Sequence, residues 1–514
     1  MHARPVILAA TLLLGVTAAA PHGPYDVDPV MVAKIREEGL QHSQVMDRES
    51  YMTDVLGARF TVSEDMKRAQ AWVKGEMERI GLVNVTVEPY VDWGVTWDNE
   101  YVSLHLLEPD YQPMVGYPIA YTSSTNGKEV LQAVIVDVQT RPDLEKYRGT
   151  LKGKAILVTP PAVIDLAPLT NGVQRRNEED LKKIVETVIK PPAAVVARTP
   201  RNPDVLTAVE KLAFYKAEGV AAVLQCESGW LGAVRGFARP GAAADHWSRE
   251  GALASPVIVA VTPEHYNRMY RILKRDIPVK IEVEVRNRIG EKVEQAMNIT
   301  GDIPGSDLKD QVVMIGAHFD TWHASPNATD NTSGVAVVLE AARILHAVGA
   351  KPRRTIRVAL WSGEEEGLIG SRAYVLKHFG NPKDPKVGAR PEFEKFSAYF
   401  NQDYGAGQYR GIYLQGNEQA RAMLTAWMEP FHDLGMTVVS NQSLGSTDHV
   451  SFDDIGLPAF QFLQDRVPAE GGHTNLDFFD TVQAPDLMKN SVIMASFAYH
   501  AAMSDERVPH KTLK

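Results

Sequence analysis

The 514-residue sequence contains a single cysteine, Cys226, and no tail of one charge sign. One cysteine excludes an intramolecular disulfide and a metal cluster built from thiolates. Because Cys226 follows the apolar run 220–224, we expect a buried, inert thiol and not a nucleophile. The 54 Lys and Arg residues against 64 Asp and Glu give a formal charge of -10, which argues against nucleic acid as a partner. The Gly-x-Ser-x-Gly pattern is also missing, which disfavours a serine hydrolase.

The first 20 residues have the features of an export signal. His2 and Arg4 precede an apolar stretch from Val6 to about Ala20, shorter than the roughly 20 residues that cross a bilayer. We therefore predict a signal peptide over residues 1–20, no permanent membrane anchor, and delivery to the periplasm or the extracellular space. No other segment has the pattern of a transmembrane helix.

The chain is too long for one typical hydrophobic core, so more than one domain is expected. Residues 26–95 are predicted to be largely helical, and a strand-rich region follows, interrupted by a proline-marked excursion at about 170–203. We expect residues 21–115 to be the N-terminal part of a main domain that is completed by residues 284–514. Residues 116–283 are expected to form a β-rich insert.

The C-terminal half alternates strands with helices. The expected strands are 311–317, 355–361, 396–401 and 458–463, and the expected helices are 335–345, 370–378, 414–428 and 486–503. Strands separated by helices of this size predict an α/β fold with a mixed, largely parallel sheet sandwiched by helices.

Acidic and histidine side chains gather where these strands end: His318, Asp320, Asp330, Glu364, Glu365, Asp403 and His473. In a parallel sheet such positions converge on one edge. Imidazole and carboxylate ligands without thiolate suit zinc. Two neighbouring zinc ions need one bridging carboxylate, and a histidine and a carboxylate each. Asp330, His318 with Asp403, and His473 with Glu365 supply that inventory.

The remaining two acids have expected roles of their own. Glu364 is left to act as general base on a hydroxide that bridges the metals, and then to protonate the leaving amine. Asp320 is placed to orient His318 through its other ring nitrogen. Singly, each residue has a structural explanation, such as a helix N-cap for Asp330 or a solvated turn for Glu364. The ordered set is what favours a metal centre.

Three segments resemble the co-catalytic di-zinc exopeptidase family: 316–320, 328–334 and 360–367. This family includes secreted bacterial leucine aminopeptidases, glutamate carboxypeptidases and the non-enzymatic transferrin receptor. The resemblance implies the same two zinc sites, with Glu364 as base, and the β-rich insert resembles a protease-associated domain. Position 403 is aspartate and not glutamate, a choice that accompanies aminopeptidase activity in the family that the chain resembles. The segment 446–449 resembles a pocket-wall motif, so Asp448 and His449, together with Tyr404, are expected to contact substrate; a structural role for His449 is the alternative.

The sequence therefore predicts a di-zinc aminopeptidase acting on peptides, with its oligomeric state left open. The nearest alternative is a carboxypeptidase or dipeptidase on the same site. That activity needs a cation for the substrate carboxylate, and no arginine lies beside the motifs in the sequence. A non-catalytic receptor-like scaffold and a glutaminyl cyclase are further alternatives.

Overall fold

The computed structural model describes residues 25–511, apart from 165, 167–173, 188–201, 228, 230 and 468–471. The predicted signal peptide lies outside these residues. Among the helices of the described ranges, none has the length and apolar character needed to cross a membrane.

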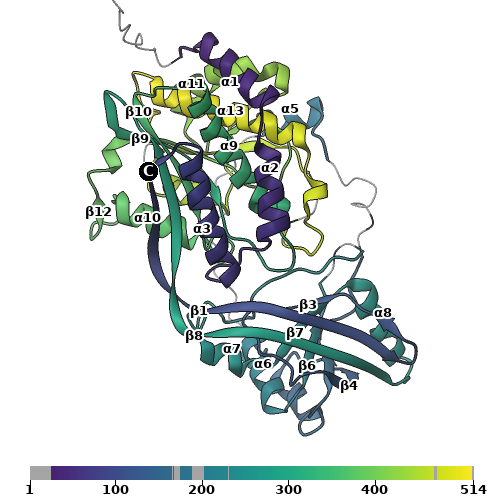
Figure 1. Cartoon of the computed structure of the whole chain (residues 1–514). Helices are drawn as coiled ribbons and strands as arrows, with labels where there is room; N and C mark the ends of the chain where they lie inside the picture. The colour runs from purple at the N-terminus through teal and green to yellow at the C-terminus, as the bar shows by residue number, and fades with distance from the viewer. Residues whose placement is uncertain are drawn as a thin grey trace, which may run out of the picture.

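The main part of the molecule is built on a sheet whose strands follow the order β15-β14-β16-β13-β9-β10-β8, with β1 paired to the outer side of β8. Figure 1 shows β1 and β8 running side by side as two long strands. The strands are β1 (Val83–Glu108), β8 (Val279–Ile303), β9 (Leu308–His318), β10 (Arg354–Trp361), β13 (Phe396–Asn401), β14 (Tyr409–Tyr413), β15 (Val438–Ser440) and β16 (Ala459–Gln464). The four strands β10, β9, β13 and β16 are parallel to one another. Strand β8 runs antiparallel to β10, and β14 runs antiparallel to β16 but parallel to β15. The predicted mixed, largely parallel sheet is confirmed.

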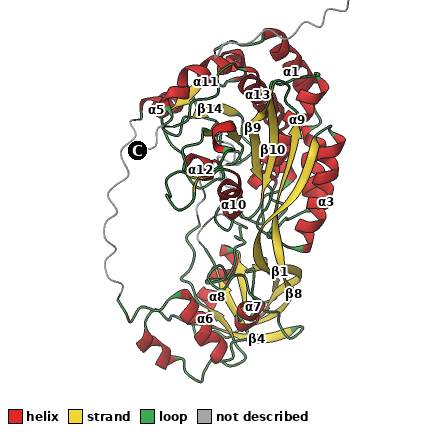
Figure 2. Ribbon diagram, turned by 90° about the vertical axis from the view of Figure 1, so that its left-hand side faces the viewer, coloured by secondary structure: helices red, strands yellow, loops and turns green. Residues whose placement is uncertain are grey.

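Helices cover both faces of this sheet, as the turned view in Figure 2 shows. One face carries α1 (Pro29–Gln41), α2 (Val45–Ser50), α3 (Glu64–Arg79), α9 (Ser333–Ala347), α11 (Arg421–Met428) and α13 (Ala484–Met503). The other carries α10 (Ile369–His378) and α12 (His449–Asp453). Successive residues of β9 alternate between the two layers: Val313 and Ile315 join the first core and Met314 the second. Burial on both faces explains the continuous apolar runs from which these strands were predicted.

A second, smaller part lies at the far end of β1 and β8 (Figure 1). It contains β2 (Gln112–Pro113), β3 (Gly116–Pro118), β4 (Glu129–Ile135), β5 (Ala155–Leu157), β6 (Ala222–Gln225), β7 (Val257–Val261), α6 (Ala208–Ala217), α7 (Arg249–Ala254) and α8 (Pro263–Leu273). Strand β8 belongs to both parts, because residues 279–283 pair with β4 and residues 299–303 pair with β10. The two hydrophobic cores therefore share one hydrogen-bonded sheet.

Two local expectations were wrong. The helical N-terminal region ends at Arg79, and β1 begins at Val83, so residues 83–95 are strand. The helix expected over 414–428 is shorter, because a turn closed by Asn417 N donating to Leu414 O at 2.8 Å precedes the single helical turn Glu418–Ala420 and α11. Gly416 has a φ of 73° in this turn, a conformation that ends a regular element.

Candidate active site

A cavity of about 790 Å³ opens at the carboxyl ends of the central parallel strands. Its lining includes five of the predicted site residues: Asp330, Glu364, Glu365, Asp403 and His473. His318 and Asp320 are fully buried directly behind them. The structure thus brings together all seven residues predicted for the metal centre.

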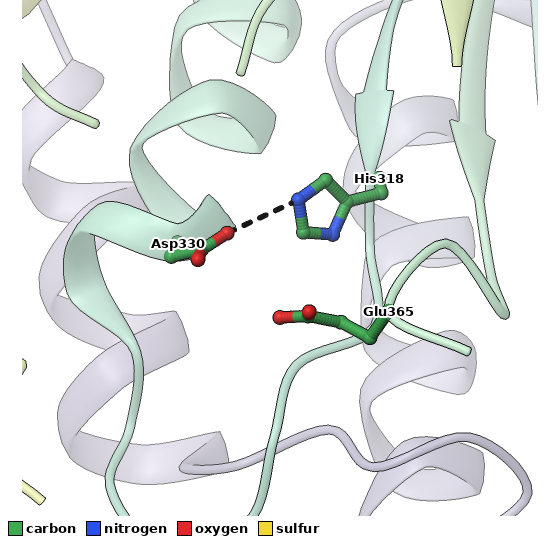
Figure 3. Close-up of side chains that lie close together, drawn as sticks. All are labelled: His318, Asp330 and Glu365. Carbon is green, nitrogen blue, oxygen red and sulfur yellow. Dashed lines mark ion pairs between the residues drawn. The ribbon is translucent and has the colours of Figure 1, made fainter. Parts of the chain in front are cut away.

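Asp330 is the centre of this cluster. Its Oδ1 lies 3.3 Å from His318 Nε2, and its Oδ2 lies 3.0 Å from His473 Nε2 (Figure 3 shows the first of these pairs). Each imidazole also faces a second carboxylate: Asp403 Oδ1 is 3.5 Å from His318 Nε2, and Glu365 Oε2 is 2.8 Å from His473 Nε2. The arrangement is a bridging carboxylate flanked by two His–carboxylate pairs.

The turn that carries Asp330 is held in place by Asp477, a residue far along the chain. Asp330 lies in the turn Ala328–Thr332, which runs directly into α9. The carboxylate of Asp477 accepts the backbone N–H of Thr329 at 2.9 and 3.1 Å and that of Asp330 at 3.2 Å. Asp477 is completely buried, and burial raises its pKa to about 7. It therefore holds the backbone of the bridging residue in place.

His473 is positioned by the second part of the molecule. Gly236 N donates to His473 O at 3.1 Å, and the Asn475 side chain accepts from Val234 N at 2.6 Å and donates to Gly232 O at 3.1 Å. His473 itself has a φ of 62°, a strained conformation of the kind found at functional sites. The segment 232–238 thus clamps the loop of a predicted metal ligand.

A steric constraint explains why the residue before His473 is a glycine. A Cβ atom on Gly472 would lie 2.7 Å from Asp330 Oδ2, too close for any other residue to fit without moving the carboxylate. Close packing of the Gly472 backbone against the Asp330 side chain is what lets His473 reach that carboxylate.

Asp320 acts differently from the sequence-based expectation. The ring nitrogen Nδ1 of His318 is 3.0 Å from the backbone oxygen of Asp320, whereas the Asp320 carboxylate is 3.9 Å away. That carboxylate accepts the backbone N–H groups of Glu364 at 3.3 Å and Glu365 at 3.1 Å. Asp320 therefore orients His318 through its main chain and the two glutamates through its side chain.

The electrostatics of the cluster favour cations. Burial lowers the pKa of His473, but the charges of Glu365 and Asp330 outweigh it and raise this pKa to about 11. Burial also opposes protonation of His318, and again the neighbouring carboxylates, Glu364 first, raise its pKa well above the usual value. Burial and the charge of Asp330 raise the pKa of Glu365 to about 7, against the opposing effect of His473. A site that draws protons onto both imidazoles has a surplus of negative charge.

The donor set fits divalent metal ions. Ligand atoms of His318, Asp330 and Glu365 lie within 4.8 Å of one another. Glu365 Oε1 is buried and has no hydrogen-bond partner among the described residues, which leaves it available to a cation. Nitrogen and oxygen donors of this kind are those that zinc takes in catalytic sites.

Of the three residues expected to contact substrate, Tyr404 lines the cavity, and its hydroxyl donates to Gly445 O at 2.5 Å. Asp448 and His449 lie behind the cavity wall, fully buried. His449 Nε2 is 2.7 Å from the side chain of Gln415 and 3.0 Å from Leu444 O. The structural role is the one that this geometry favours for His449.

Sequence reasoning missed three arginines. Arg176, Arg372 and Arg466 all line the same cavity as the predicted ligands. Arg176 is distant from the motifs along the chain, whereas Arg372 follows the 360–367 segment and Arg466 precedes His473 by a few residues. The argument against a cation near the site was therefore wrong, because it considered only the residues within the motifs.

The family comparison agrees with this geometry. The model of Peptidase family M28 matches residues 298–498, a range that begins before β9, ends within α13 and contains every predicted metal ligand. Residues 298–498 of the chain thus match peptidase family M28. This match and the relatives support a metallopeptidase, and the cavity at the carboxyl ends of the strands is the candidate active site.

Curated relatives match the chain over different lengths. Carboxypeptidase Q of Xenopus laevis is 22% identical over 472 residues, which cover 92% of this chain and 88% of that protein. Leupeptin-inactivating enzyme 1 of Streptomyces exfoliatus is 30% identical over a shorter stretch of 162 residues, 31% of this chain and 34% of that protein.

Solved structures share the fold. The Peptidase M28 precursor from Shewanella amazonensis superposes with a TM-score of 0.67 at 24% identity, covering 94% of this chain and 99% of that one. A zinc aminopeptidase from Bacillus subtilis superposes with a TM-score of 0.55 at 18% identity, covering 90% and 95%. The fold shared with these structures thus extends through both parts of the chain.

Proposed function

We propose that this protein is a zinc-dependent exopeptidase that holds two zinc ions around Asp330 and removes residues from the free amino end of peptides. The observation that carries the proposal is the Asp330 carboxylate, whose two oxygens face His318 and His473 at 3.3 and 3.0 Å. Asp403 and Glu365 complete one His–carboxylate pair each. One ion would be held by each pair, with Asp330 between them.

Bound zinc supplies a Lewis acid for the scissile carbonyl and lowers the pKa of an attacking water. Glu364 takes up the proton of that water and passes it to the leaving amine. Its position fits this role, since it lines the cavity beside the ligands but forms neither of the His–carboxylate pairs. Burial raises the pKa of Glu364 well above its usual value, which brings the carboxylate closer to the range where it can both accept and return a proton.

Three features support the amino end as the site of cleavage. A substrate ammonium group is attracted by the carboxylates that crowd the metal end of the cavity. Position 403 carries aspartate, as the resemblance to aminopeptidases implies. The Bacillus subtilis structural neighbour is itself a zinc aminopeptidase.

A second candidate is cleavage from the carboxyl end. It is favoured by the carboxypeptidase Q relatives and by Arg176 and Arg466 of the cavity wall, whose charge suits a terminal carboxylate. The two candidates use the same metal centre and differ in which end of the peptide must be free.

One experiment separates them. The purified protein is offered the same peptide with a free or an acetylated amino end, before and after chelation. Cleavage of the free form alone, lost on chelation and restored by zinc, is the expected result. Equal cleavage of both forms would replace the aminopeptidase proposal with the carboxypeptidase one.

We further propose that residues 1–20 direct export and that residues 116–283 form a protease-associated domain. Peptides are the proposed partners. N-terminal sequencing of protein recovered outside the cytoplasm tests the export proposal, and an uncleaved residue 1 would contradict it.

A further inference from the structure

The cavity is lined by groups of both charge signs. Asp330, Glu365 and Asp403 of the predicted metal site line it, and so do Arg176 and Arg466. These two arginines come from segments that lie side by side, because Gln174 pairs with Arg466 and Arg176 Nε donates to Gln464 O. A substrate in this cavity therefore meets a cationic region as well as the anionic metal site.

The arginine pair is assembled by two distant segments. Gln174 and Arg466 form an antiparallel bridge, with backbone N···O distances of 2.9 and 3.1 Å. Arg176 N donates to Asp465 Oδ1 at 2.9 Å, and Arg176 Nε donates to Gln464 O at 2.8 Å. Since Gln464 is the last residue of β16 and residues 465–466 follow it, these bonds dock the 174–176 segment at the cavity edge of the sheet.

Side-chain alternation sends neighbouring residues in opposite directions here. Gln464 and Arg466 line the cavity, while Asp465 between them is buried on the other side. Asp465 Oδ2 lies 3.4 Å from both Arg175 Nη1 and Arg410 Nη1. The arginines on the buried side are thus neutralised by a carboxylate.

The two arginines on the cavity side have no carboxylate partner among the described residues. In the described ranges, the guanidinium of Arg466 has neither an ion pair nor a hydrogen bond, and that of Arg176 has only its Nε bond to a backbone oxygen. Arg466 is exposed and Arg176 half-buried. Two guanidinium groups left with free donors on the wall of a peptide site are suited to a planar carboxylate.

We propose that Arg176 and Arg466 bind a carboxylate of the substrate on the leaving-group side of the scissile bond. This inference rests on the proposed function, because it places the amino end at the zinc ions and the arginines further along the peptide. The carboxylate is that of the carboxyl terminus in short peptides, or that of an acidic side chain near it. The enzyme would then select short or acidic peptides, with the 174–176 segment contributing to selectivity.

The test uses zinc-loaded full-length protein and tripeptides with a neutral first residue. One pair differs in a free or amidated carboxyl end, and a second, amidated pair ends in glutamate or glutamine. The free-acid member is expected to have a KM about tenfold or more below its amide, the effect of a charge-assisted contact. A preference confined to the first pair assigns the terminus, and one confined to the second assigns the acidic side chain.

Arg466→Gln and Arg176→Gln should each raise the KM of the acidic peptide toward that of its neutral counterpart, with kcat and the neutral peptide little changed. Arg372→Gln is the matched control, since it removes the same charge from the same cavity outside the pair. Zinc content should stay constant in all three variants. An unchanged KM ratio in Arg466→Gln and Arg176→Gln would overturn the proposal, as would an equal effect of Arg372→Gln.

The aminopeptidase proposal and the arginine proposal can be refuted separately. If acetylation abolishes cleavage while neither acidic group matters, the aminopeptidase proposal stands and the arginine subsite falls. If acetylation is tolerated while the Arg466→Gln effect persists, the arginines bind a carboxylate in an enzyme that cuts from the other end.

Discussion

His318 and His473 face opposite oxygens of a single carboxylate, with Nε2 atoms 3.3 and 3.0 Å from Oδ1 and Oδ2 of Asp330. The Asp330 carboxylate is therefore in contact with the histidines of both His–carboxylate pairs. We predict that Asp330→Asn loses both zinc ions, because an amide lacks the charge and the second anionic oxygen that bridging requires. Elemental analysis of the purified variant measures the loss.

Asp403→Asn provides the comparison, because Asp403 adjoins His318 and not His473. It should lose one ion and keep the other. Retention of both ions in Asp330→Asn would show that the carboxylate does not bridge.

Glu364→Gln should lower kcat by about 100-fold or more, the range for removing a general base, while leaving the zinc content unchanged. Steady-state kinetics together with elemental analysis make the measurement. Loss of zinc in this variant would assign Glu364 to the ligands instead.

Zinc binding should release protons and weaken as the pH falls. In the metal-free protein the pKa of His473 is raised to about 11 and that of His318 is also raised, so both imidazoles carry protons that zinc must displace near neutral pH. Calorimetric titration in two buffers of different ionisation enthalpy measures the proton release. An apparent affinity that does not change between about pH 6 and about pH 8 would contradict the prediction.

The raised pKa of His473 also determines how the stability of the metal-free protein changes with pH. A folded-state pKa above the unfolded value means that protonated His473 stabilises the metal-free fold at low pH, and that this contribution is lost as the pH rises through about 11.

Asn475→Ala should reduce zinc affinity at the His473 site by about tenfold, the size of effect seen when a residue that orients a ligand is removed. The substitution removes both side-chain bonds to the 232–238 segment. Competition with a chromogenic chelator measures the affinity.

Asn267→Ala is a matched control. Asn267 also bonds a backbone N–H and a backbone oxygen, both of Ala162, at 2.8 Å each, within the second part of the molecule. It should cost stability without changing zinc affinity. If both substitutions lowered zinc affinity equally, the cause would be a general loss of stability and not the loss of the Asn475 hydrogen bonds that position His473.

The central sheet could be predicted because strands buried on both faces leave long apolar runs, as in residues 312–317 of β9. The first half of β1 lacks that signal. Its residues 83–92 mix exposed and half-buried positions, and irregular register with β8 near Pro89 and Gly94 breaks the alternation. A strand held by such pairing can be recognised only when its partner is known.

The metal ligands were predictable because each lies near a strand end, where chain topology alone brings side chains together. Arg176 and Asn475 were not, because their roles depend on contacts between segments more than 200 residues apart, such as Asn475 with Val234 at a separation of 241. The role of Asp320 was only partly foreseen, since residue type does not reveal whether a side chain or its carbonyl makes the contact.

The shared strand β8 has a consequence for how the protein denatures. Val279, Ile281 and Val283 are core residues of the smaller part, and Ile299 and Ile303 are core residues of the larger one, all on one continuous strand. Unfolding of either core would disrupt the hydrogen bonds of β8, on which the other core also depends. The two cores are therefore expected to unfold in a single cooperative calorimetric transition. Excising residues 109–278 would leave Leu104 and Ile281 uncovered at the tip of a bare ribbon, and the remaining peptidase would be prone to self-association.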